Sequence, residues 1–359
     1  MNKRLIQTFQ DIVRIDSVSG EEDEISQYLQ KLISKVGISY RVDDYGNIIA
    51  SIEGTGVPLF FSAHMDTVEP GRNIMAVIKD GYLVSKGETI LGADNKAAIA
   101  AIIETVYVIT EGSIQNRPLE IIFTRSEETG NYGALALDES LIMAKEGYCF
   151  DSSQAVGTMV MSSPAYERFE LEILGKDAHA SRPEEGINAL TILSRIIQDF
   201  PMGRINEQTV INIGLITGGS VRNTVLGRIQ CSGEIRSFNE EALNKHKINF
   251  ENVVSKATKA LTADYKLSWV RENGAYVLTN SEAKDFVERT RLLITSIGLE
   301  AHESNPWGVS DANIFNDKGL FCMNLADGTE FSHTVEERIK ITELEEMHRL
   351  MVRLATNES

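Results

Sequence analysis

Short apolar runs that alternate with helical segments are the feature that most narrows the fold of this chain. Residues 58–63 (Pro-Leu-Phe-Phe-Ser-Ala) follow a Gly-Thr-Gly turn, and residues 119–123 and 147–150 are further short, mostly apolar runs. Such runs are typical of strands buried on both faces of a sheet. Residues 97–109, which lie between two of them, are mostly apolar over a helical length. Strands that alternate with helices predict a layered α/β fold around a mainly parallel sheet.

The two ends of the chain share this pattern. Residues 5–36 have apolar side chains at helical spacing, with a break at residues 17–20, and so predict two amphipathic helices. Residues 281–297 predict another helix and residues 320–325 another strand. We therefore expect residues 1–165 and 276–359 to form one catalytic domain.

Between these parts, the sequence pattern changes. From residue 166, apolar and charged side chains alternate, and a helix is predicted at residues 189–199. Alternating strands follow at 210–216 and 228–236, then a long charged helix at 240–261 and a strand at 265–270. This β-α-β-β-α-β order predicts a compact α+β domain, residues 166–275, inserted into the first fold.

Charge and composition exclude several classes of protein. The 359 residues include 35 Lys and Arg against 52 Asp and Glu, a formal net charge of −17 that repels phosphate backbones and argues against nucleic acid as a partner. The N-terminal segment lacks the apolar core of a signal peptide, and no later stretch is apolar enough to span a bilayer. We therefore expect a cytoplasmic protein without membrane contact. The isolated cysteines, Cys149, Cys231 and Cys322, are expected to be reduced thiols in the core.

Side chains that can bind metal ions stand next to the predicted elements. They are His64, Asp94, Glu127, Glu128, Asp151 and His333. Each also has an ordinary structural explanation: a lone histidine beside an aspartate, a helix N-cap at Asp94, or solvated carboxylates at the Glu pair. The carboxyl ends of parallel strands meet at one edge of a sheet, however, so we expect these groups to converge there.

The ligand types indicate which ions would fit. Two histidines and three carboxylates with one shared aspartate suit a pair of divalent ions about 3.5–4 Å apart. Nitrogen and oxygen ligands without a thiolate are compatible with zinc, cobalt or manganese. Asp66, two residues after His64, can hold the second N–H of that imidazole.

Several ordered motifs resemble a known family across almost the whole chain. They are Ser-Ala-His-Met-Asp-Thr at 62–67, Leu-Gly-Ala-Asp-Asn-Lys-Ala at 91–97, Ser-Glu-Glu-Thr-Gly at 126–130, Lys-Asp-Ala-His-Ala at 176–180, Gly-Gly-Ser at 218–220 with Asn223, Gly-Val-Ser-Asp-Ala-Asn at 308–313 and Ser-His-Thr at 332–334. The sequence thereby resembles the co-catalytic zinc peptidases and deacylases, which include peptidase T, glutamate carboxypeptidase, aminoacylase and succinyl-diaminopimelate desuccinylase. Residues 90–94 are most similar to the peptidase T branch.

The resemblance implies a role for each matching residue. His64 and Asp151 would hold one metal ion, Glu128 and His333 the other, and Asp94 would bridge both. Asp66 would support His64, Glu127 would act as the general base, and a cis peptide bond would follow Asp94. The implied cofactor is a pair of divalent ions per subunit, zinc first, with cobalt or manganese as alternatives.

The resemblance also assigns functions to the inserted domain. It implies a homodimer formed through residues 166–275, which also act as a lid, with His179 reaching into the partner's active site. Asn223 and Arg236 would bind polar ends of the substrate. From the residues alone, His179 also fits a surface loop and Arg236 a charge at the end of a strand. Val309 and the Ser152-Ser153 pair depart from the commoner family residues, so the resemblance does not fix the choice of substrate.

These observations support one leading hypothesis and several alternatives. The leading hypothesis is a dinuclear metal-dependent hydrolase that cleaves short peptides from the amino end, as a tripeptide aminopeptidase does. An N-acyl amino acid deacylase or a carboxypeptidase of the same family would use the same chemistry. A catalytically silent metal-dependent scaffold and a nucleotide-binding α/β protein are alternatives from other classes. The nucleotide alternative lacks both a Gly-x-Gly-x-x-Gly motif and a phosphate-binding glycine loop of the Walker type.

Overall fold

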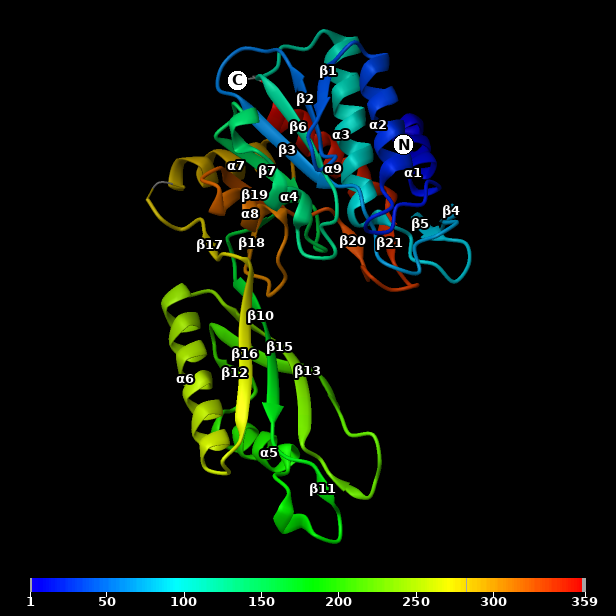
Figure 1. Cartoon of the computed structure of the whole chain (residues 1–359). Helices are drawn as coiled ribbons and strands as arrows, with labels where there is room; N and C mark the ends of the chain where they lie inside the picture. The colour runs from blue at the N-terminus through cyan, green and yellow to red at the C-terminus, as the bar shows by residue number, and fades with distance from the viewer. Residues whose placement is uncertain (1, 282, 357–359) are drawn as a thin grey trace. The chain divides into compact units, whose positions relative to one another are not determined.

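The chain forms two compact units. The computed structural model describes residues 2–281 and 283–356. Unit 1 comprises Met1–Ser162, Val277–Pro306 and Ser310–Ser359, and unit 2 comprises Ser163–Tyr276 with Trp307–Val309 (Figure 1). Two short strands, β9 (Ser162–Ser163) and β17 (Tyr276–Val277), lie where the chain passes from one unit to the other.

Unit 1 contains an eight-stranded sheet in the order β1-β2-β6-β3-β7-β19-β8-β18. The strands are β1 (Ser39–Val42), β2 (Ile48–Ile52), β3 (Leu59–His64), β6 (Leu119–Thr124), β7 (Glu146–Phe150), β8 (Thr158–Val160), β18 (His302–Ser304) and β19 (Phe321–Leu325). The pairs β6–β3, β3–β7, β7–β19 and β8–β18 are parallel, whereas β1–β2, β2–β6 and β19–β8 are antiparallel. The predicted α/β fold is confirmed, but the sheet is mixed and only its middle is continuously parallel.

A tight turn explains one antiparallel pair. Strands β1 and β2 are joined by residues 43–47, where Asp43 accepts hydrogen bonds from the backbone N–H groups of Tyr45, Gly46 and Asn47. An antiparallel pair needs only such a turn, whereas a parallel pair needs a long crossover. The exposed strand β1 lacks the apolar run that identified the other strands.

Both faces of the central strand β3 are covered. The Phe60 ring packs edge-on against Phe315 of helix α8 (Asp311–Asp317), with ring centroids 5.4 Å apart. The next residue, Phe61, points to the other face and contacts the Phe150 ring at 5.4 Å. All six residues of β3 are buried, which accounts for the absence of polar alternation in this run.

The helices of unit 1 surround this sheet. They are α1 (Lys3–Val13), α2 (Asp23–Lys35), α3 (Ala93–Gly112), α4 (Tyr132–Ala136), the 3₁₀ turn η1 (Glu139–Leu141), α7 (Lys284–Ser296), α8 and α9 (Ile341–Ala355). Helix α3 packs against β3, α1 and α9, so it is apolar on nearly all sides. The two predicted N-terminal helices are confirmed as α1 and α2. Within residues 2–281 and 283–356, no helix combines the length and apolar character that crossing a bilayer requires.

A second, small sheet in unit 1 joins distant parts of the sequence. It has the order β20-β21-β5-β4, with β4 (Ala76–Lys79), β5 (Tyr82–Ser85), β20 (Thr329–Glu330) and β21 (Arg338–Lys340). Strand β21 pairs antiparallel with β5, so that Arg338 lies opposite Val84. The segment just before β21 is thereby brought beside the segment that follows β5. The sequence pattern did not predict this sheet, because its strands are only two to four residues long.

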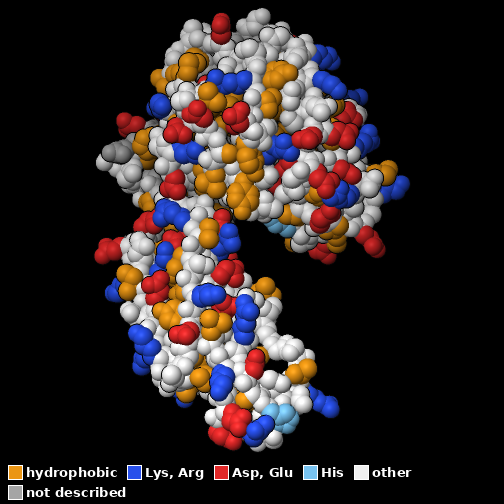
Figure 2. Space-filling view, viewed as in Figure 1, with side chains coloured by type: hydrophobic (Ala, Val, Ile, Leu, Met, Phe, Trp, Pro, Cys, Tyr) orange, Lys and Arg blue, Asp and Glu red, His pale blue; other side chains and the backbone are white. Residues whose placement is uncertain are grey.

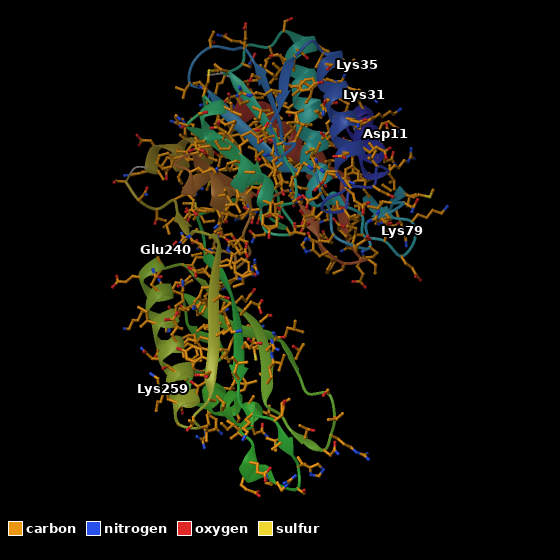
Figure 3. All side chains as sticks on the ribbon, viewed as in Figure 1. Asp11, Lys31, Lys35, Lys79, Glu240 and Lys259 are labelled. Carbon is orange, nitrogen blue, oxygen red and sulfur yellow. The ribbon has the colours of Figure 1, made fainter. Side chains whose placement is uncertain are left out.

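Unit 2 is an antiparallel sheet with two helices packed against it. The strand order is β12-β13-β15-β10-β16. Its main elements are β10 (Ala165–Leu174), α5 (Ala189–Asp199), β12 (Gly203–Asn206), β13 (Thr209–Gly218), β15 (Arg228–Ser237), α6 (Glu240–Lys259) and β16 (Asp264–Asn273). The side chains labelled Glu240 and Lys259 in Figure 3 mark the two ends of α6. The predicted element order is present, with β12 as an additional edge strand whose Gly-Arg-Ile-Asn sequence carries no strand pattern.

Aromatic side chains form much of the core of unit 2. Phe250 of α6 contacts Phe169 at 5.0 Å, Phe200 at 5.1 Å and Trp269 at 6.0 Å between ring centroids. The chain has two tryptophans, and both Trp269 and Trp307 belong to unit 2. Tryptophan fluorescence should therefore report on unit 2, whereas circular dichroism reports on both units.

On the surface of the protein, Figure 2 shows acidic and basic side chains interspersed over the visible face.

We predict that Phe250→Ala destabilises unit 2 selectively. Removal of a buried ring that touches three aromatic neighbours should lower the free energy of unfolding by about 3–5 kcal/mol. The midpoint of urea unfolding followed by tryptophan fluorescence should fall. The unfolding of unit 1, followed by circular dichroism, should change much less. Ile248→Ala, on the same helix but 60% exposed, is the control and should shift neither midpoint appreciably. An unshifted fluorescence midpoint in Phe250→Ala would contradict this description of the core.

Candidate metal centre

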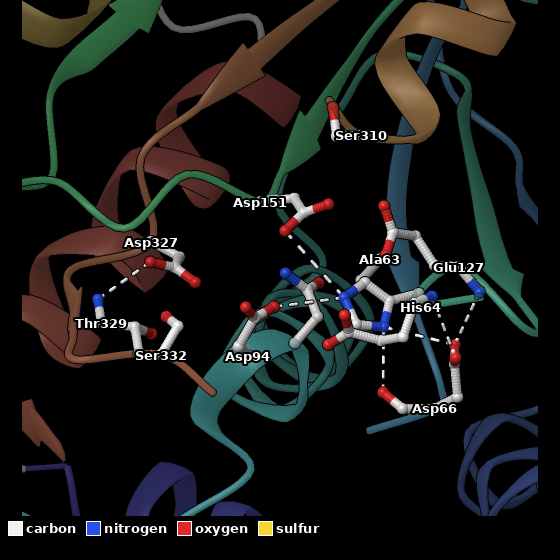
Figure 4. Close-up of polar contacts among 12 residues, drawn as sticks. Ala63, His64, Asp66, Asp94, Glu127, Asp151, Ser310, Asp327, Thr329 and Ser332 are labelled. Atoms are coloured by element: carbon white, nitrogen blue, oxygen red, sulfur yellow. Dashed lines mark hydrogen bonds and ion pairs between the residues drawn. The ribbon is translucent and has the colours of Figure 1, made fainter. Parts of the chain in front are cut away.

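Ends of neighbouring parallel strands bring the candidate ligands together in unit 1. His64 is the last residue of β3, Asp151 follows β7, and the pair Glu127-Glu128 lies in the loop after β6. Asp94 lies at the start of α3, and His333 follows the short strand β20. Figure 4 shows the His64 imidazole with Asp94, Asp151 and Glu127 around it. His64, Asp151 and the Glu127-Glu128 pair thus lie at the edge of the main sheet where the sequence predicted convergence, whereas Asp94 and His333 join them from a helix start and from a loop after the small sheet.

Two groups of potential ligands share Asp94. His64 Nε2 lies 3.2 Å from Asp94 Oδ1 and 3.9 Å from Asp151 Oδ1. His333 Nε2 lies 2.9 Å from Glu128 Oε1 and 3.4 Å from the other Asp94 oxygen, Oδ2. In each group, His64-Asp94-Asp151 and Asp94-Glu128-His333, the potential ligand atoms lie within 4.8 Å of one another. The peptide bond from Asp94 to Asn95 is cis, as the family resemblance implied.

The tautomer of His64 favours a cation at this place. Its Nδ1 atom lies 2.9 Å from the backbone carbonyl oxygen of Asp66, which can only accept, so Nδ1 donates a hydrogen bond there. In the neutral ring, Nε2 then carries a lone pair that points toward the carboxylates of Asp94 and Asp151. Three groups of acceptor character face one another in this arrangement. A divalent cation between them satisfies all three, so the residues fit a metal ion.

The pKa shifts of the side chains at the site also favour a bound cation. Desolvation, followed by repulsion from Asp151, raises the pKa of Glu127 well above its ordinary value, and desolvation with repulsion from Asp94 does the same to the pKa of Asp151. Hydrogen bonds to Asp94 and Glu128 raise the pKa of His333 to about 10. Without metal ions, Glu127 and Asp151 therefore tend to retain protons. Bound divalent cations would favour their ionised forms.

Asp66 organises more of the site than a hydrogen bond to His64. Its carboxylate lies 3.4 Å from His64 Nδ1, and it accepts hydrogen bonds from the backbone N–H groups of Glu127 (2.9 Å) and Glu128 (3.1 Å). It also accepts one from the Ser19 hydroxyl at 2.6 Å. The expected support of His64 thus comes mainly from the Asp66 carbonyl, while the carboxylate holds the loop that carries both glutamates.

The segment between α1 and α2 contacts the same loop. Glu22, which is fully buried, accepts hydrogen bonds from Ser126 N at 3.0 Å and from the Arg125 side chain at 2.8 Å. With Ser19, it ties residues 17–22 to the loop of Glu127. The sequence predicted only a break between helices at residues 17–20, and no pattern in it indicated that Ser19 and Glu22 are tied to this loop.

One amide orients the candidate general base. Asn131 Nδ2 donates to Glu127 Oε1 at 2.9 Å and to Asp311 Oδ1 at 3.0 Å. Asp311, 1% exposed, also accepts a hydrogen bond from Thr124 at 2.5 Å. Asp311 belongs to a family motif that gave it no role, and no sequence signal pointed to Asn131. Together these two residues fix the orientation of one oxygen of Glu127.

Within unit 2, the three remaining candidates fall into two places. His179 pairs with Thr224 in the β11–β14 ladder, formed by Ala178–His179 and Thr224–Val225, and the N–H of Ala180 donates to the carbonyl of Asn223 at 2.9 Å. The side chains of His179 and Asn223 are both exposed. The structure therefore brings these two residues together at one end of the sheet.

Arg236 lies elsewhere in unit 2. At a rise of about 3.4 Å per residue, it is about 27 Å further along β15 than Arg228, which adjoins the β11–β14 ladder. Its guanidinium group pairs with Glu234 at 3.1 Å, donates to the Trp307 carbonyl at 2.9 Å and lies over the Tyr166 ring. Arg236 is thus already engaged by its own unit and is remote from His179 and Asn223 of the same chain.

Comparison with known proteins identifies the family. A model of Peptidase family M20/M25/M40 matches residues 60–357. The chain therefore belongs to this peptidase family, which confirms the resemblance inferred from the sequence motifs.

Individual relatives are more specific. The uncharacterized protein YqjE of Bacillus subtilis (strain 168) is 35% identical over 365 aligned residues, which cover 98% of this chain and 97% of that protein. The structure of aminopeptidase PepT from Bacillus cereus ATCC 10987 is 34% identical with a TM-score of 0.92, covering 98% and 97% of the two chains. A tripeptidase from Staphylococcus aureus subsp. aureus Mu50 is 31% identical with a TM-score of 0.95 and the same coverage. The protein thus resembles PepT-type aminopeptidases and tripeptidases.

Proposed function

We propose that this protein is a dinuclear metal-dependent aminopeptidase that removes the first residue from short, unblocked peptides, tripeptides above all. The observation that carries the proposal is the pair of ligand groups that share Asp94, with the carboxylate of Glu127 beside them. The names of the two structural relatives, an aminopeptidase PepT and a tripeptidase, support the choice of substrate. We further propose zinc as the metal, with cobalt or manganese as alternatives, since the nitrogen and oxygen ligands accept all three.

The proposed ligands divide between the two ions. His64 and Asp151 would hold one ion, Glu128 and His333 would hold the other, and Asp94 would contribute to both, which is supported by the contact of each Asp94 oxygen with a different histidine. The ions supply Lewis acidity toward a carbonyl group and acidify water. The carbonyl of Asp66 keeps the proton of His64 on Nδ1, so that Nε2 remains available as a ligand.

Glu127 is the proposed general base. Its carboxylate lies beside the ligand groups, with one oxygen held by Asn131. The other oxygen takes a proton from the attacking water and passes it to the leaving amino group of the peptide bond. Bound divalent cations would favour the ionised form of Glu127, which is the form that can accept this proton.

The first test is activity toward a matched set of substrates. The protein loaded with Zn²⁺ should release the N-terminal residue of unblocked tripeptides, measured by chromatography of the products. Treatment with a chelator should abolish the activity, and added metal should restore it, because the ligand groups cannot replace the Lewis acid. The same tripeptides with an acetylated N-terminus serve as controls and should resist cleavage. Release of the C-terminal residue would indicate a carboxypeptidase, and exclusive cleavage of N-acyl amino acids a deacylase.

The second test separates the two adjacent glutamates. Glu127→Gln should lower kcat by about 10²–10⁴-fold, because the amide cannot accept the proton from water, while two metal ions per chain remain bound. Glu128→Gln should lose metal from one site as well as activity, since it removes a proposed ligand. Metal content measured by atomic spectroscopy distinguishes these outcomes. Normal turnover in Glu127→Gln would exclude Glu127 as the base, whereas absence of turnover from the unmodified, metal-loaded protein would revive the alternative of a silent metal-dependent scaffold.

We also propose a homodimer formed through unit 2. Beyond Ile211, strand β13 pairs with β15 on one side and with no other strand among residues 2–281 and 283–356. Its free edge carries exposed apolar side chains, with Leu215 at 57% and Ile216 at 50% exposure. An unpaired strand edge with apolar residues is a favourable place for pairing with a second copy. In this dimer, His179 and Asn223 are proposed to complete the partner's active site and bind substrate.

Mixing inactive variants tests the dimer and His179 together. His179→Ala should keep its metal ions but lose rate, as should Glu127→Gln. When the two are mixed and allowed to exchange subunits, half of the dimers are mixed and each has one complete site, so activity should return to about a quarter of that of the unmodified protein. Adding Leu215→Lys to both variants should prevent pairing along β13 and abolish the rescue. Absence of rescue from the original pair, despite exchange, would contradict the role of His179 across the dimer.

The compartment is a further part of the proposal. Cys149, Cys231 and Cys322 are buried and unbridged. Reduced thiols fit the cytoplasm, where we propose that the enzyme acts.

A further inference from the structure

Glu337 holds the backbone of the loop that carries Asp94. Its Oε2 atom accepts hydrogen bonds from the N–H groups of Leu91 and Gly92, both at 2.8 Å, and its Oε1 atom accepts one from Asp94 N at 3.0 Å. The residue is 2% exposed. One buried carboxylate therefore satisfies three backbone donors, including that of the residue proposed to bridge the metal ions.

The N-cap residue of α3 has no side chain that could accept hydrogen bonds from these N–H groups. Helix α3 begins at Ala93, and its N-cap residue, Gly92, adopts the left-handed conformation with φ of 70° and provides no capping hydrogen bond. The first N–H groups of a helix need acceptors, and a negative charge near them is favourable. Glu337 provides both from a position 243 residues away in the sequence.

The backbone of the same residue is tied to the loop of His333. Glu337 N donates to the Thr334 carbonyl at 3.1 Å, and Thr334 N donates to the Phe331 carbonyl at 3.3 Å. Residues 331–337 therefore form two successive turns. The pairing of β21 with β5 places this segment beside residues 86–92. Glu337 thus connects two loops that each carry a proposed ligand of the same ion, Asp94 and His333.

We infer that Glu337 is a positioning residue that sets the Asp94 and His333 ligands in register for the metal ion that they share with Glu128. The inference rests on the proposed function and deepens it. Asp94 contacts both ligand groups, but His333 belongs to only one, so displacement of the Glu337 contacts should affect the Glu128–His333 ion more than the His64–Asp151 ion. Loss of such an outer contact to a ligand lowers metal affinity by about 10–100-fold.

Zinc binding to metal-free protein tests this inference without any assay of activity. Competition with a chromophoric chelator should show two sites in the unmodified protein and one in each of the reference variants His333→Ala and His64→Ala. Glu337→Gln keeps the shape of the side chain but places an NH₂ group against backbone donors. In Glu337→Gln, the site formed with Glu128 and His333 should lose about 10–100-fold in affinity. The binding isotherm of this variant should therefore approach that of His333→Ala and not that of His64→Ala.

Two further variants separate positioning from general stability. Glu337→Asp retains the charge but shortens the reach, and it should weaken the same site. Glu336→Gln, at the exposed neighbouring position, should bind both ions as the unmodified protein does. At saturating zinc, kcat of Glu337→Gln should recover most of its loss with KM little changed, since the missing factor is occupancy of one ion.

Each remaining outcome counts against the inference. Unchanged affinity at both sites in Glu337→Gln would overturn it while the proposed function stands. Equal weakening of both sites together with a lowered melting temperature would reduce Glu337 to a structural residue and also overturn it. Failure of the unmodified protein to bind two zinc ions would remove the proposed function itself, and this inference with it.

Discussion

Mutual repulsion among carboxylates withdrawn from water is the constraint on which the rest of unit 1 depends. Asp94, Glu127, Glu128 and Asp151 lie around two histidines, and Nε2 of His64 faces two of the acids. A cluster of this kind is unfavourable unless cations compensate it. Divalent ions are the simplest compensation, since a single ion can contact several oxygens and an imidazole nitrogen at once.

Backbone hydrogen bonds hold these groups in place despite the repulsion. Asp66 accepts the N–H groups of Glu127 and Glu128, and Glu337 accepts those of the loop that carries Asp94. Both anchoring groups are themselves buried carboxylates, so the structure uses acids that do not contact a metal to orient acids that do in the proposed site. Hydrogen bonds from N–H groups to a buried carboxylate are strong, which makes them effective at fixing loops.

Much of the site was predictable because a parallel sheet converts order in the sequence into proximity. His64, Asp151 and the Glu127-Glu128 pair each follow a recognisable apolar strand, and adjacent parallel strands end at one edge. Asp94 and His333 were included through helix and loop positions. The motifs identified His179 and Asn223 separately, and the structure places them together in unit 2. Arg236 shows the limit of this reasoning, because its position in the sequence gave no sign that Glu234 and the Trp307 carbonyl engage it.

The sequence by itself determined the α/β class, the alternation of buried strands and helices, and the identity of the candidate ligands, since hydrophobic periodicity and residue chemistry are local properties. Only the tertiary structure decided that the main sheet is mixed, that a small sheet joins residues 76–85 to residues 329–340, and that Glu337 meets the backbone of residues 91–94. Pairing between segments some 250 residues apart depends on which unpaired backbone edges and buried donors remain after local structure has formed. No local pattern in the chain encodes that choice.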